Sequence, residues 1–395
     1  MLERAGRSER LTGRIAVVID PWDYPFNGTV VSTRRFVAAL EALGYHFEIL
    51  SLPAAGLPAE NSFEKLSIPG VNRVIDSMRA PLAKPDRAKI RRLLSGCALL
   101  HVQYPFFLAY TAIREARRLE LPVVCSFHVQ PENILQNIRL PSRLLARLLY
   151  RVFIRFIYNA ADHVITPSSF AANLLTQHGL KVPVTVLSNG VPERFFRVAH
   201  EPSDGRFTLL SVGRLAREKQ QETLLRAAAL SRHRDAIEIV LAGVGPRERY
   251  LEKLAARLGV AARIGWVDDE ELLSLYGKAD IFVHAGTIEL EGMSVLEAMA
   301  AGNVVVVSDA PASACAAMIH EAEARFRKGD PQDLAERIDY WLEHPEAGAA
   351  QRRFNRLYAQ ALSHDRAALR LQSFYDDLAS RPPVGTVETQ MTGVS

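Results

Sequence analysis

The sequence predicts an α/β protein with two doubly wound domains that face each other across a cleft. Short apolar runs alternate with stretches of helical periodicity, which is the pattern of parallel strands covered by helices. The alternation is interrupted by a polar stretch near residues 195–205 and then begins again. With 395 residues the chain is also too long for one core of ordinary size, so two domains are expected.

The first Rossmann-like domain is predicted over residues 14–195. A helix is expected from Val31 to Leu43, because its apolar residues recur at helical spacing and Gly44 follows as a stop signal. Strand, loop, helix and strand in that order form a βαβ unit. The predicted strands are Arg14–Asp20, Phe47–Leu52, Ala98–Gln103, Pro122–Phe127 and Ala161–Thr166.

The second Rossmann-like domain is predicted over residues 206–363, followed by a separate helical segment over 364–380. The predicted strands are Phe207–Val212, Ile237–Ala242, Ile281–Ala285 and Asn303–Val307. The predicted helices are Gln221–Ala229, Glu248–Leu258, Asp269–Tyr276, one reaching from Asp330 to Leu342 and one from His364 to Leu378.

The composition argues against several classes of protein. Lys and Arg together number 48 and Asp and Glu 44, so the net charge of +4 argues against a bulk nucleic-acid binder but leaves room for a local basic patch. The three cysteines, Cys97, Cys125 and Cys315, show no metal-ligand spacing and no disulfide framework, which fits a reducing cytoplasm. We expect neither a signal peptide nor a transmembrane helix, because no run of about 18 uncharged apolar residues occurs.

Acidic residues gather where the strand Ile281–Ala285 gives way to a helix that starts near Met293 or Ser294. Glu289 and Glu291 are expected on the loop, and Glu297 in the first or second turn of the helix. Open α/β sheets bind ligands at the carboxyl ends of their strands, and a helix N-terminus favours anions. Carboxylates also accept hydrogen bonds from sugar hydroxyls. The alternative is that these carboxylates only complement the helix dipole.

Several stretches resemble motifs of the family 4 (group 1) retaining glycosyltransferases. Glu289 and Glu297 hold the spacing of the Glu-x7-Glu motif, and Leu296–Gly302 matches the helix of that motif. Gly213–Lys219 resembles the Gly-Arg-Leu…Glu-Lys signature. Asn27-Gly28 resembles the glycine loop, with Asn27 in place of the usual glycine. The resemblance covers about 15–380.

The resemblance implies the two-domain GT-B fold, with the last helix crossing back to the first domain. It also implies a retaining glycosyltransferase with no bound metal and no cofactor, in which a nucleotide sugar, UDP- or GDP-linked, is the co-substrate. The sequence is consistent with the absence of a metal, because it has no Asp-x-Asp at a strand end and no cluster of His and Cys at ligand spacing. The implied catalytic residues are His128, Arg214, Lys219 and Glu289. The implied donor-binding residues are Asn27, Gly28, Gly213, Glu291, Gly292, Met293, Ser294 and Glu297.

The chemistry of these residues suits a nucleotide sugar. Arg214 and Lys219 would straddle the donor diphosphate and neutralise the charge that grows on the leaving phosphate. Glu289 is expected to hold sugar hydroxyls and Glu297 the ribose. The alternative for Arg214 and Lys219 is that both are ordinary solvent-facing basic residues.

The segment after the strand Pro122–Phe127 points to the acceptor. His128 stands directly beyond this strand and is followed by Gln130, Glu132 and Asn133. The arrangement resembles the His-x-x-x-Glu region of glycosyltransferases that use lipid acceptors such as diacylglycerol. That resemblance implies that His128 contacts the transferred sugar and that Gln130, Glu132 and Asn133 lie near the acceptor.

Residues 139–158 combine regularly spaced arginines with apolar residues and contain no acidic residue. The arginines fall at every fourth position, so on a helix they form a slowly winding stripe. Such a helix is typical of binding to an anionic membrane surface, and the alternative is a core helix with one solvated face. We expect a peripheral protein on the cytoplasmic face of a membrane. The arginines of the stripe are Arg139, Arg143, Arg147, Arg151 and Arg155.

Other functions remain open at this stage. Within the enzyme class, the acceptor could be a soluble polysaccharide precursor or a small metabolite instead of a lipid or lipid-linked glycan. A sugar-nucleotide-binding protein without turnover is a second class, which the intact Arg214, Lys219, Glu289 and Glu297 argue against. A glycan phosphorylase is a third, but no lysine in the second domain is marked as a pyridoxal carrier.

Overall fold

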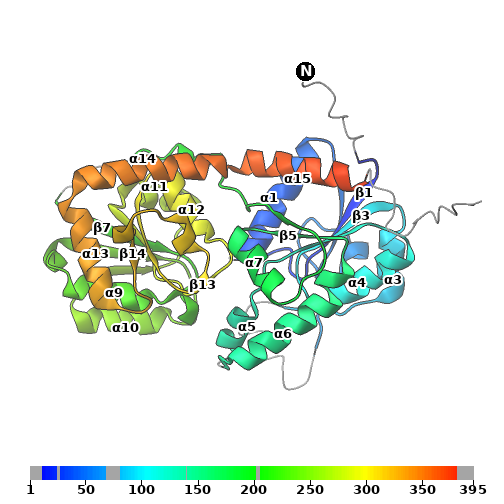
Figure 1. Cartoon of the computed structure of the whole chain (residues 1–395), viewed down its shortest axis with the longest axis horizontal. Coiled ribbons are helices and arrows are strands. Elements are labelled where there is room, and N and C mark those ends of the chain that lie inside the picture. The colour runs from blue at the N-terminus through cyan, green and yellow to red at the C-terminus, as the bar shows by residue number, and fades with distance from the viewer. Residues whose placement is uncertain (1–10, 25–26, 68–80, 139, 202–204, 380–395) are drawn as a thin grey trace, which may run out of the picture.

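The chain folds into two α/β lobes, each built around one parallel sheet of six strands (Figure 1). The computed structural model describes residues 11–24, 27–67, 81–138, 140–201 and 205–379. The strand order is β2-β1-β3-β4-β5-β6 in the first sheet and β14-β12-β10-β7-β8-β9 in the second. The predicted fold class, two doubly wound α/β domains, is therefore confirmed.

The first lobe has helices on both faces of its sheet. Along β1, Ile15 and Val17 pack with α1 and α15 on one face, while Ala16 and Val18 pack with α3, α4, α6 and α7 on the other. The strands are β1 (Arg14–Val18), β2 (His46–Leu50), β3 (Cys97–Val102), β4 (Val123–Ser126), β5 (His163–Thr166) and β6 (Val184–Val186). The helices are α1 (Gly28–Ala42), α3 (Arg87–Leu94), α4 (Phe107–Arg118), α5 (Pro131–Asn137), α6 (Arg143–Phe156), α7 (Ser169–Gln177) and α15 (His364–Ala379).

The second lobe forms one continuous apolar core around its sheet. Its strands are β7 (Phe207–Val212), β8 (Ile237–Ala242), β9 (Ala261–Gly265), β10 (Ile281–His284), β12 (Val304–Ser308) and β14 (Arg325–Phe326), with β11 (Ile288–Glu289) paired to β13 (Ala312–Ser313) beside it. Its helices are α9 (Gln221–Leu230), α10 (Glu248–Leu258), α11 (Asp269–Lys278), α12 (Met293–Ala301), α13 (Pro331–Glu343) and α14 (Pro345–Ala361), and the short α8 (Glu193–Phe196) precedes them.

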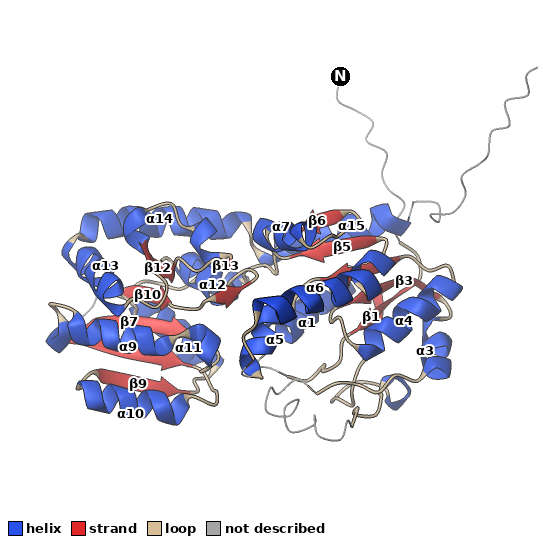
Figure 2. Ribbon diagram, turned by 60° about the horizontal axis from the view of Figure 1, so that its bottom comes forward, coloured by secondary structure: helices blue, strands red, loops and turns tan. Residues whose placement is uncertain are grey.

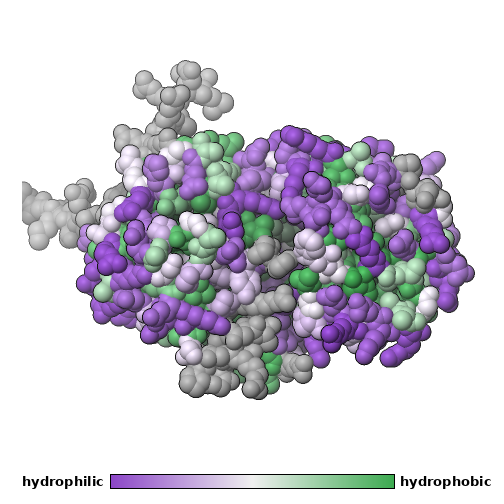
Figure 3. Space-filling view, turned by 180° about the vertical axis from the view of Figure 1, so that it is seen from behind, coloured by the Kyte–Doolittle hydropathy of each residue, from purple (hydrophilic) through white to green (hydrophobic). Residues whose placement is uncertain are grey.

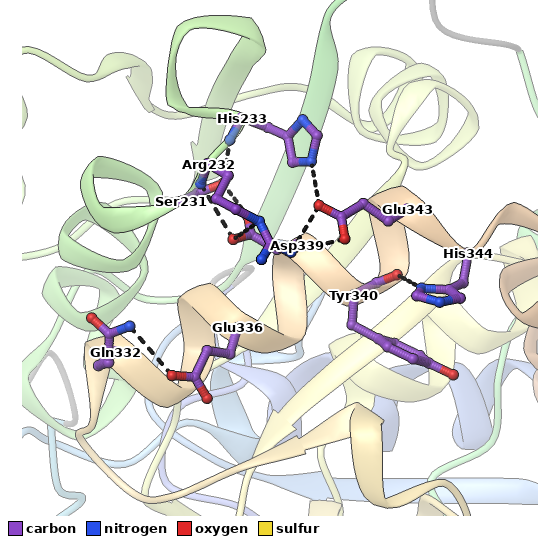
Figure 4. A network of polar contacts seen from close by, with 9 residues as sticks. All are labelled: Ser231, Arg232, His233, Gln332, Glu336, Asp339, Tyr340, Glu343 and His344. Carbon is purple, nitrogen blue, oxygen red and sulfur yellow. Dashed lines mark hydrogen bonds and ion pairs between the residues drawn. The ribbon is translucent and has the colours of Figure 1, made fainter.

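A polar network fixes α13 to the turn after α9 (Figure 4). The Ser231 hydroxyl donates to Asp339 at 2.5 Å, and the Arg232 guanidinium donates to both oxygens of Glu343 at 2.8 Å. These bonds hold the outer helix of the second lobe. Hydrophilic side chains cover most of the face of both lobes seen in Figure 3.

The chain crosses between the lobes twice, and the two crossings touch. Val191, after β6, forms an isolated β-bridge with Ser363, which stands between α14 and α15. The two helices follow one another along the top of the molecule in Figure 1, with α14 on the second lobe and α15 on the first. On the first lobe, the Tyr375 hydroxyl lies 2.5 Å from Nδ1 of the buried His101. Within the described ranges, no helix is both long and apolar enough to cross a bilayer.

Two helix starts differ from the prediction. Helix α1 begins at Gly28 instead of Val31, because the Asn27 side chain caps it. Helix α6 begins at Arg143, because the Ser142 hydroxyl accepts a hydrogen bond from the N–H of Leu145 and caps it there. The predicted helix from 139 was therefore wrong in its first turn, and Arg139 itself lies outside the described residues. Helices α3, α4, α5 and α14 were not predicted.

Gly190, at the crossing between the lobes, has no room for a side chain. Its φ is +76°, and a Cβ there would lie 2.6 Å from Cα of His364. We expect Gly190→Ala to lower the free energy of unfolding by more than about 2 kcal/mol, because backbone strain and a collision with a backbone atom add together. Urea unfolding measures this.

Gly179→Ala is the matched control, because Gly179 also has positive φ, +96°, but no atom within 4 Å of its added Cβ. It carries the cost of strain alone, about 1 kcal/mol. Equal losses of stability in the two variants would contradict the tight contact between Gly190 and His364.

Candidate active site

The N-terminal ends of α1 and α12 meet at the interlobe seam, the region where loops at the carboxyl ends of the two sheets touch. A Cβ added to Gly28, the first residue of α1, would lie 3.3 Å from Sδ of Met293, the first residue of α12. Helix N-termini carry unpaired N–H groups and a partial positive charge. Two such ends at one place favour an anionic ligand, and Gly292 and Ser294 of the predicted donor site flank Met293.

Asn27 does not continue a glycine loop. Its Oδ1 accepts hydrogen bonds at 3.0 Å from the N–H of Thr29 and from the Tyr104 hydroxyl. The side chain is therefore occupied in capping α1, and Gly28 is the predicted loop residue that faces the second lobe.

Glycines fix the path of the loop that carries Arg214 and Lys219. A Cβ on Gly243, after β8, would lie 2.0 Å from the carbonyl oxygen of Gly213, after β7. The Gly213 N–H donates to the carbonyl of Ala242 at 3.0 Å. The two loops therefore lie directly against each other, and only glycine at position 243 permits this close approach.

Lys219, Glu289 and His284 form a polar group at the seam, in which His284 is buried and Lys219 and Glu289 are half-buried. Lys219 Nζ donates to Oε1 of Glu289, and Nε2 of His284 lies 3.3 Å from the same oxygen. Burial raises the pKa of Glu289, but Lys219 and His284 outweigh it and lower the pKa to about 2. Burial lowers the pKa of His284, but the Cys315 thiol and Glu289 outweigh it and raise the pKa to about 9. At neutral pH Lys219 and Glu289 therefore form an ion pair, and His284 lies beside the carboxylate of that pair.

Arg214 makes contact with both lobes. Its Nη2 donates to Oε1 of Glu218 at 2.6 Å and to Oδ1 of Asn137, the last residue of α5, at 2.7 Å. The Arg214 side chain is 30% exposed, so it is partly accessible to solvent. The two predicted phosphate-binding cations thus stand on one short loop, each next to a carboxylate.

Glu291 bonds to the first lobe. Its carboxylate accepts hydrogen bonds from the backbone N–H of Asn189 at 3.1 Å and from the Asn189 side-chain amide at 2.6 Å. Asn189 in turn accepts from the Ser32 hydroxyl of α1 at 2.8 Å. Burial raises the pKa of Glu291 to about 7, against hydrogen bonds from Ser188 and Asn189 that lower it. Because both carboxylate oxygens are engaged by the protein, this geometry lends no support to the predicted contact with the donor.

Glu297 lies in the second turn of α12, as predicted. The Tyr276 hydroxyl donates to its Oε2 at 3.2 Å. Burial raises the pKa of Glu297. The positive charge of Arg35, on α1 of the first lobe, acts in the opposite direction.

His128 lies beyond β4 on the first-lobe side of the seam. Burial lowers its pKa to about 4, so its imidazole is neutral at pH 7. The side chain lines a cavity of about 30 Å³ between α1, β3 and α15, together with His101 and Ser126. Nε2 of His101 lies 2.8 Å from the Ser126 hydroxyl, which fixes the floor of this cavity.

The predicted acceptor residues stand at the start of α5. Gln130 donates from Nε2 to the carbonyl of Ala312 in the second lobe at 3.1 Å. Oε2 of Glu132 accepts from the Tyr150 hydroxyl of α6 at 2.9 Å. Asn133 lies one helical turn before Asn137 and accepts from its side-chain amide at 3.0 Å.

Arg143, Arg147, Arg151 and Arg155 all lie exposed on α6. They therefore form no part of the seam. Among the residues that the structure describes, no three His, Cys, Asp or Glu side chains are grouped as metal ligands would be.

Two family models together match most of the chain. The model described as Glycosyltransferase Family 4 matches residues 26–195, and the one described as Glycosyl transferases group 1 matches residues 192–357. The chain belongs to glycosyltransferase family 4. The two-lobed fold is the GT-B arrangement that the motifs imply, and the protein is a glycosyltransferase.

This glycosyltransferase is similar to known proteins along most of its length. It is 26% identical over 317 residues to the alpha-monoglucosyldiacylglycerol synthase of Streptococcus pneumoniae, which covers 75% of this chain and 71% of that protein. It is 27% identical over 303 residues to a GDP-mannose-dependent alpha-mannosyltransferase of Corynebacterium glutamicum, covering 73% and 70%. The sucrose-phosphate synthase of Thermosynechococcus elongatus shares its fold, with a TM-score of 0.72 and 18% identity over 92% of this chain and 98% of that chain.

Several residues of the seam were not predicted. His284 ends the strand β10, and the rule that ligands bind at the carboxyl ends of strands could have identified it. Asn137 belongs to α5, which was not predicted, so no sequence signal marked it. Asn189 carried no predicted role in the site, because its bond to Glu291 joins residues far apart in the sequence.

The raised pKa of Glu291 makes stability depend on pH. An unfolded glutamate loses its proton near 4.5, whereas folded Glu291 keeps it up to about 7, so stability falls as pH rises between these values. Glu291→Gln removes this titration. We expect the wild type to lose on the order of 3 kcal/mol more unfolding free energy than the variant across this range.

Urea unfolding of both proteins at several pH values measures this difference. The buried Asp20, whose pKa burial raises to about 7, is present in both proteins, so its effect cancels. Parallel pH curves for the two proteins would contradict the shift at Glu291.

Proposed function

We propose that this glycosyltransferase is a retaining enzyme that transfers a hexose from a UDP- or GDP-linked sugar to a lipid or lipid-linked glycan at an anionic membrane surface, with no bound metal ion. The observation that carries the proposal is the position of α5. This helix bonds to the exposed, basic α6 through Glu132 and Tyr150 and to a cation of the seam through Asn137 and Arg214, so one short helix connects the two (Figure 2).

The charges of the seam favour a diphosphate. Lys219 and Arg214 place two cations on one short loop of the seam, and the ends of α1 and α12 add partial positive charge nearby. Cations that are already in place stabilise the charge that develops on a leaving phosphate. We therefore assign donor diphosphate binding to Lys219 and Arg214 and to the backbone at Gly28, Gly213 and the start of α12.

The acid–base properties of the site suit a front-face mechanism. In that mechanism the bond from the anomeric carbon to the phosphate oxygen breaks, the acceptor oxygen bonds to the same face, and the acceptor proton passes to the leaving phosphate. No side chain then has to be a strong base. With pKa values of about 4 and about 2, His128 and Glu289 are both weak bases, and both can hold sugar hydroxyls.

The surface of α6 favours a lipid acceptor. Its exposed apolar residues include Leu144, 75% exposed, and Leu148, 54% exposed, and arginines stand among them. Phe107 and Tyr110 of α4 are exposed too. Basic and apolar residues on one exposed helix are typical of proteins that lie on anionic membranes. The alpha-monoglucosyldiacylglycerol synthase among the relatives supports the same class of acceptor.

A soluble glycan is the second candidate acceptor. The chain is 28% identical over 258 residues to the glycogen synthase of Mycobacterium tuberculosis, which covers 63% of this chain and 61% of that protein. A thermal-shift screen with UDP- and GDP-sugars, followed by transfer assays on a membrane lipid extract and on soluble α-glucan, separates the two. Transfer to glucan alone would reject the lipid acceptor.

We expect Arg214→Ala and Lys219→Ala each to lower turnover by about 10²-fold or more, because each removes a charge partner of the transition state. The control is Arg217→Ala, which removes an exposed cation from the same short turn. Steady-state transfer assays measure the rates. Turnover of either variant close to that of Arg217→Ala would contradict the assignment.

The proposal also predicts that the enzyme turns over in EDTA at its ordinary rate, since cationic side chains take the role of a metal. Transfer is measured after dialysis against chelator, with and without added Mg²⁺ or Mn²⁺. Loss of activity in EDTA and its recovery with metal would show that a metal ion meets the phosphate charge.

We expect the protein to float with liposomes that contain anionic lipid and much less with neutral ones. The double variant Leu144→Ser and Leu148→Ser should bind at least about tenfold more weakly, because two apolar side chains that would enter the lipid are lost. Leu357→Ser is the control, since Leu357 is equally exposed but stands on α14 in the second lobe. Equal binding to both kinds of liposome, or none, would reject membrane docking by α6.

A further inference from the structure

Helix α5 is fixed at its two ends by the second lobe. Just before its first residue, Gln130 donates to the Ala312 carbonyl at 3.1 Å, and its last residue, Asn137, accepts from Arg214 at 2.7 Å. Figures 1 and 2 both show α5 on the side of the first lobe that faces the second. The helix that carries the acceptor residues therefore also touches the cation assigned to the donor.

The first lobe holds the same helix from its other side. The Tyr150 hydroxyl of α6, in a fully buried side chain, donates to Glu132 at 2.9 Å. Within α5, the Asn137 amide donates to the carbonyl of Asn133 at 2.8 Å and to its side-chain oxygen at 3.0 Å. The Asn137 side chain is thereby oriented, with its Oδ1 left to accept from Arg214.

The chemistry of an asparagine suits this position. One nitrogen of Arg214, Nη2, donates both to the Glu218 carboxylate and to the Asn137 amide oxygen. Glu218 is buried and already supplies one negative charge. An amide oxygen directs the guanidinium without a second negative charge, so Arg214 keeps more of its attraction for an anion.

We propose that Asn137 is a positioning residue that holds the Arg214 guanidinium from the first lobe. The position of this donor-binding cation then depends on where helix α5, which carries the acceptor residues, is placed. This inference rests on the proposed function, because it takes the donor diphosphate as the ligand of Arg214. It adds a direct physical link between the two substrate sites.

The first test compares Asn137→Ala with Gln136→Ala in transfer assays. Gln136 is the preceding residue of α5, and its side chain makes no hydrogen bond to any residue in the described part of the chain. We expect Asn137→Ala to lower kcat by about tenfold with the donor KM changed less than about threefold, since a mispositioned cation weakens the transition state more than the ground state. Melting temperatures equal to those of Gln136→Ala show that the fold is intact.

The second test uses Asn137→Asp and needs no acceptor. An aspartate can keep the contact with Arg214 but adds a negative charge beside the diphosphate. We expect the Kd for UDP or GDP, whichever the wild type binds, to rise about tenfold in Asn137→Asp and less than about threefold in Asn137→Ala. Isothermal titration calorimetry measures both.

The outcomes separate this inference from the proposed function. If the wild type transfers sugar but Asn137→Ala has the kcat of Gln136→Ala, the role of Asn137 is overturned and the proposed function stands. Unchanged binding of UDP or GDP by Asn137→Asp also overturns it. A wild type that binds neither nucleotide and transfers no sugar overturns both.

Discussion

The ion pair between Lys219 and Glu289 is the interaction on which the rest of the site depends. It joins the loop after β7 to the segment after β10, and Nε2 of His284 lies 3.3 Å from the same carboxylate. Removing Glu289 would leave the half-buried Lys219 without its partner, which is costly where little water reaches the charge. The carboxylate therefore keeps positive charge at the seam and is itself held ionised there.

Bonds between the lobes meet around this group from several directions. The contacts of Glu291 with Asn189, of Arg214 with Asn137 and of Gln130 with Ala312 each join residues of different lobes. Apart from Ala312, which begins β13, these residues lie on loops or at helix ends. The residues proposed to bind the donor and the residues that join the lobes therefore occupy the same surface, so a donor bound at the seam would change both sets of contacts.

Local pattern was sufficient for the elements with strong periodicity and clear caps. The apolar runs of β1, β7, β8 and β10 predicted both sheets, and Glu297 lies in the helix turn where spacing placed it. Prediction was poorer where one side chain decides a boundary. The cap formed by Asn27 starts α1 three residues before the predicted Val31, and the cap at Ser142 moves the start of α6 to Arg143.

The pairing of the site residues could not be read from local pattern. Lys219 and Glu289 are 70 positions apart, and Glu291 and Asn189 are 102 apart. Only the folded chain therefore shows which of these polar side chains bond to one another. The roles of Arg214 and Lys219 as phosphate-binding cations remain predictions supported by this geometry. Glu291 illustrates the difference, because its place beside the family motif suggested the donor whereas its hydrogen bonds lead to the other lobe.

The most direct measurement is a crystal structure of the protein with UDP or GDP bound. We expect oxygens of the diphosphate within hydrogen-bonding distance, about 2.7–3.2 Å, of both Lys219 Nζ and the Arg214 guanidinium. A diphosphate bound away from the seam, or at the seam but held by neither cation, would contradict the central claim.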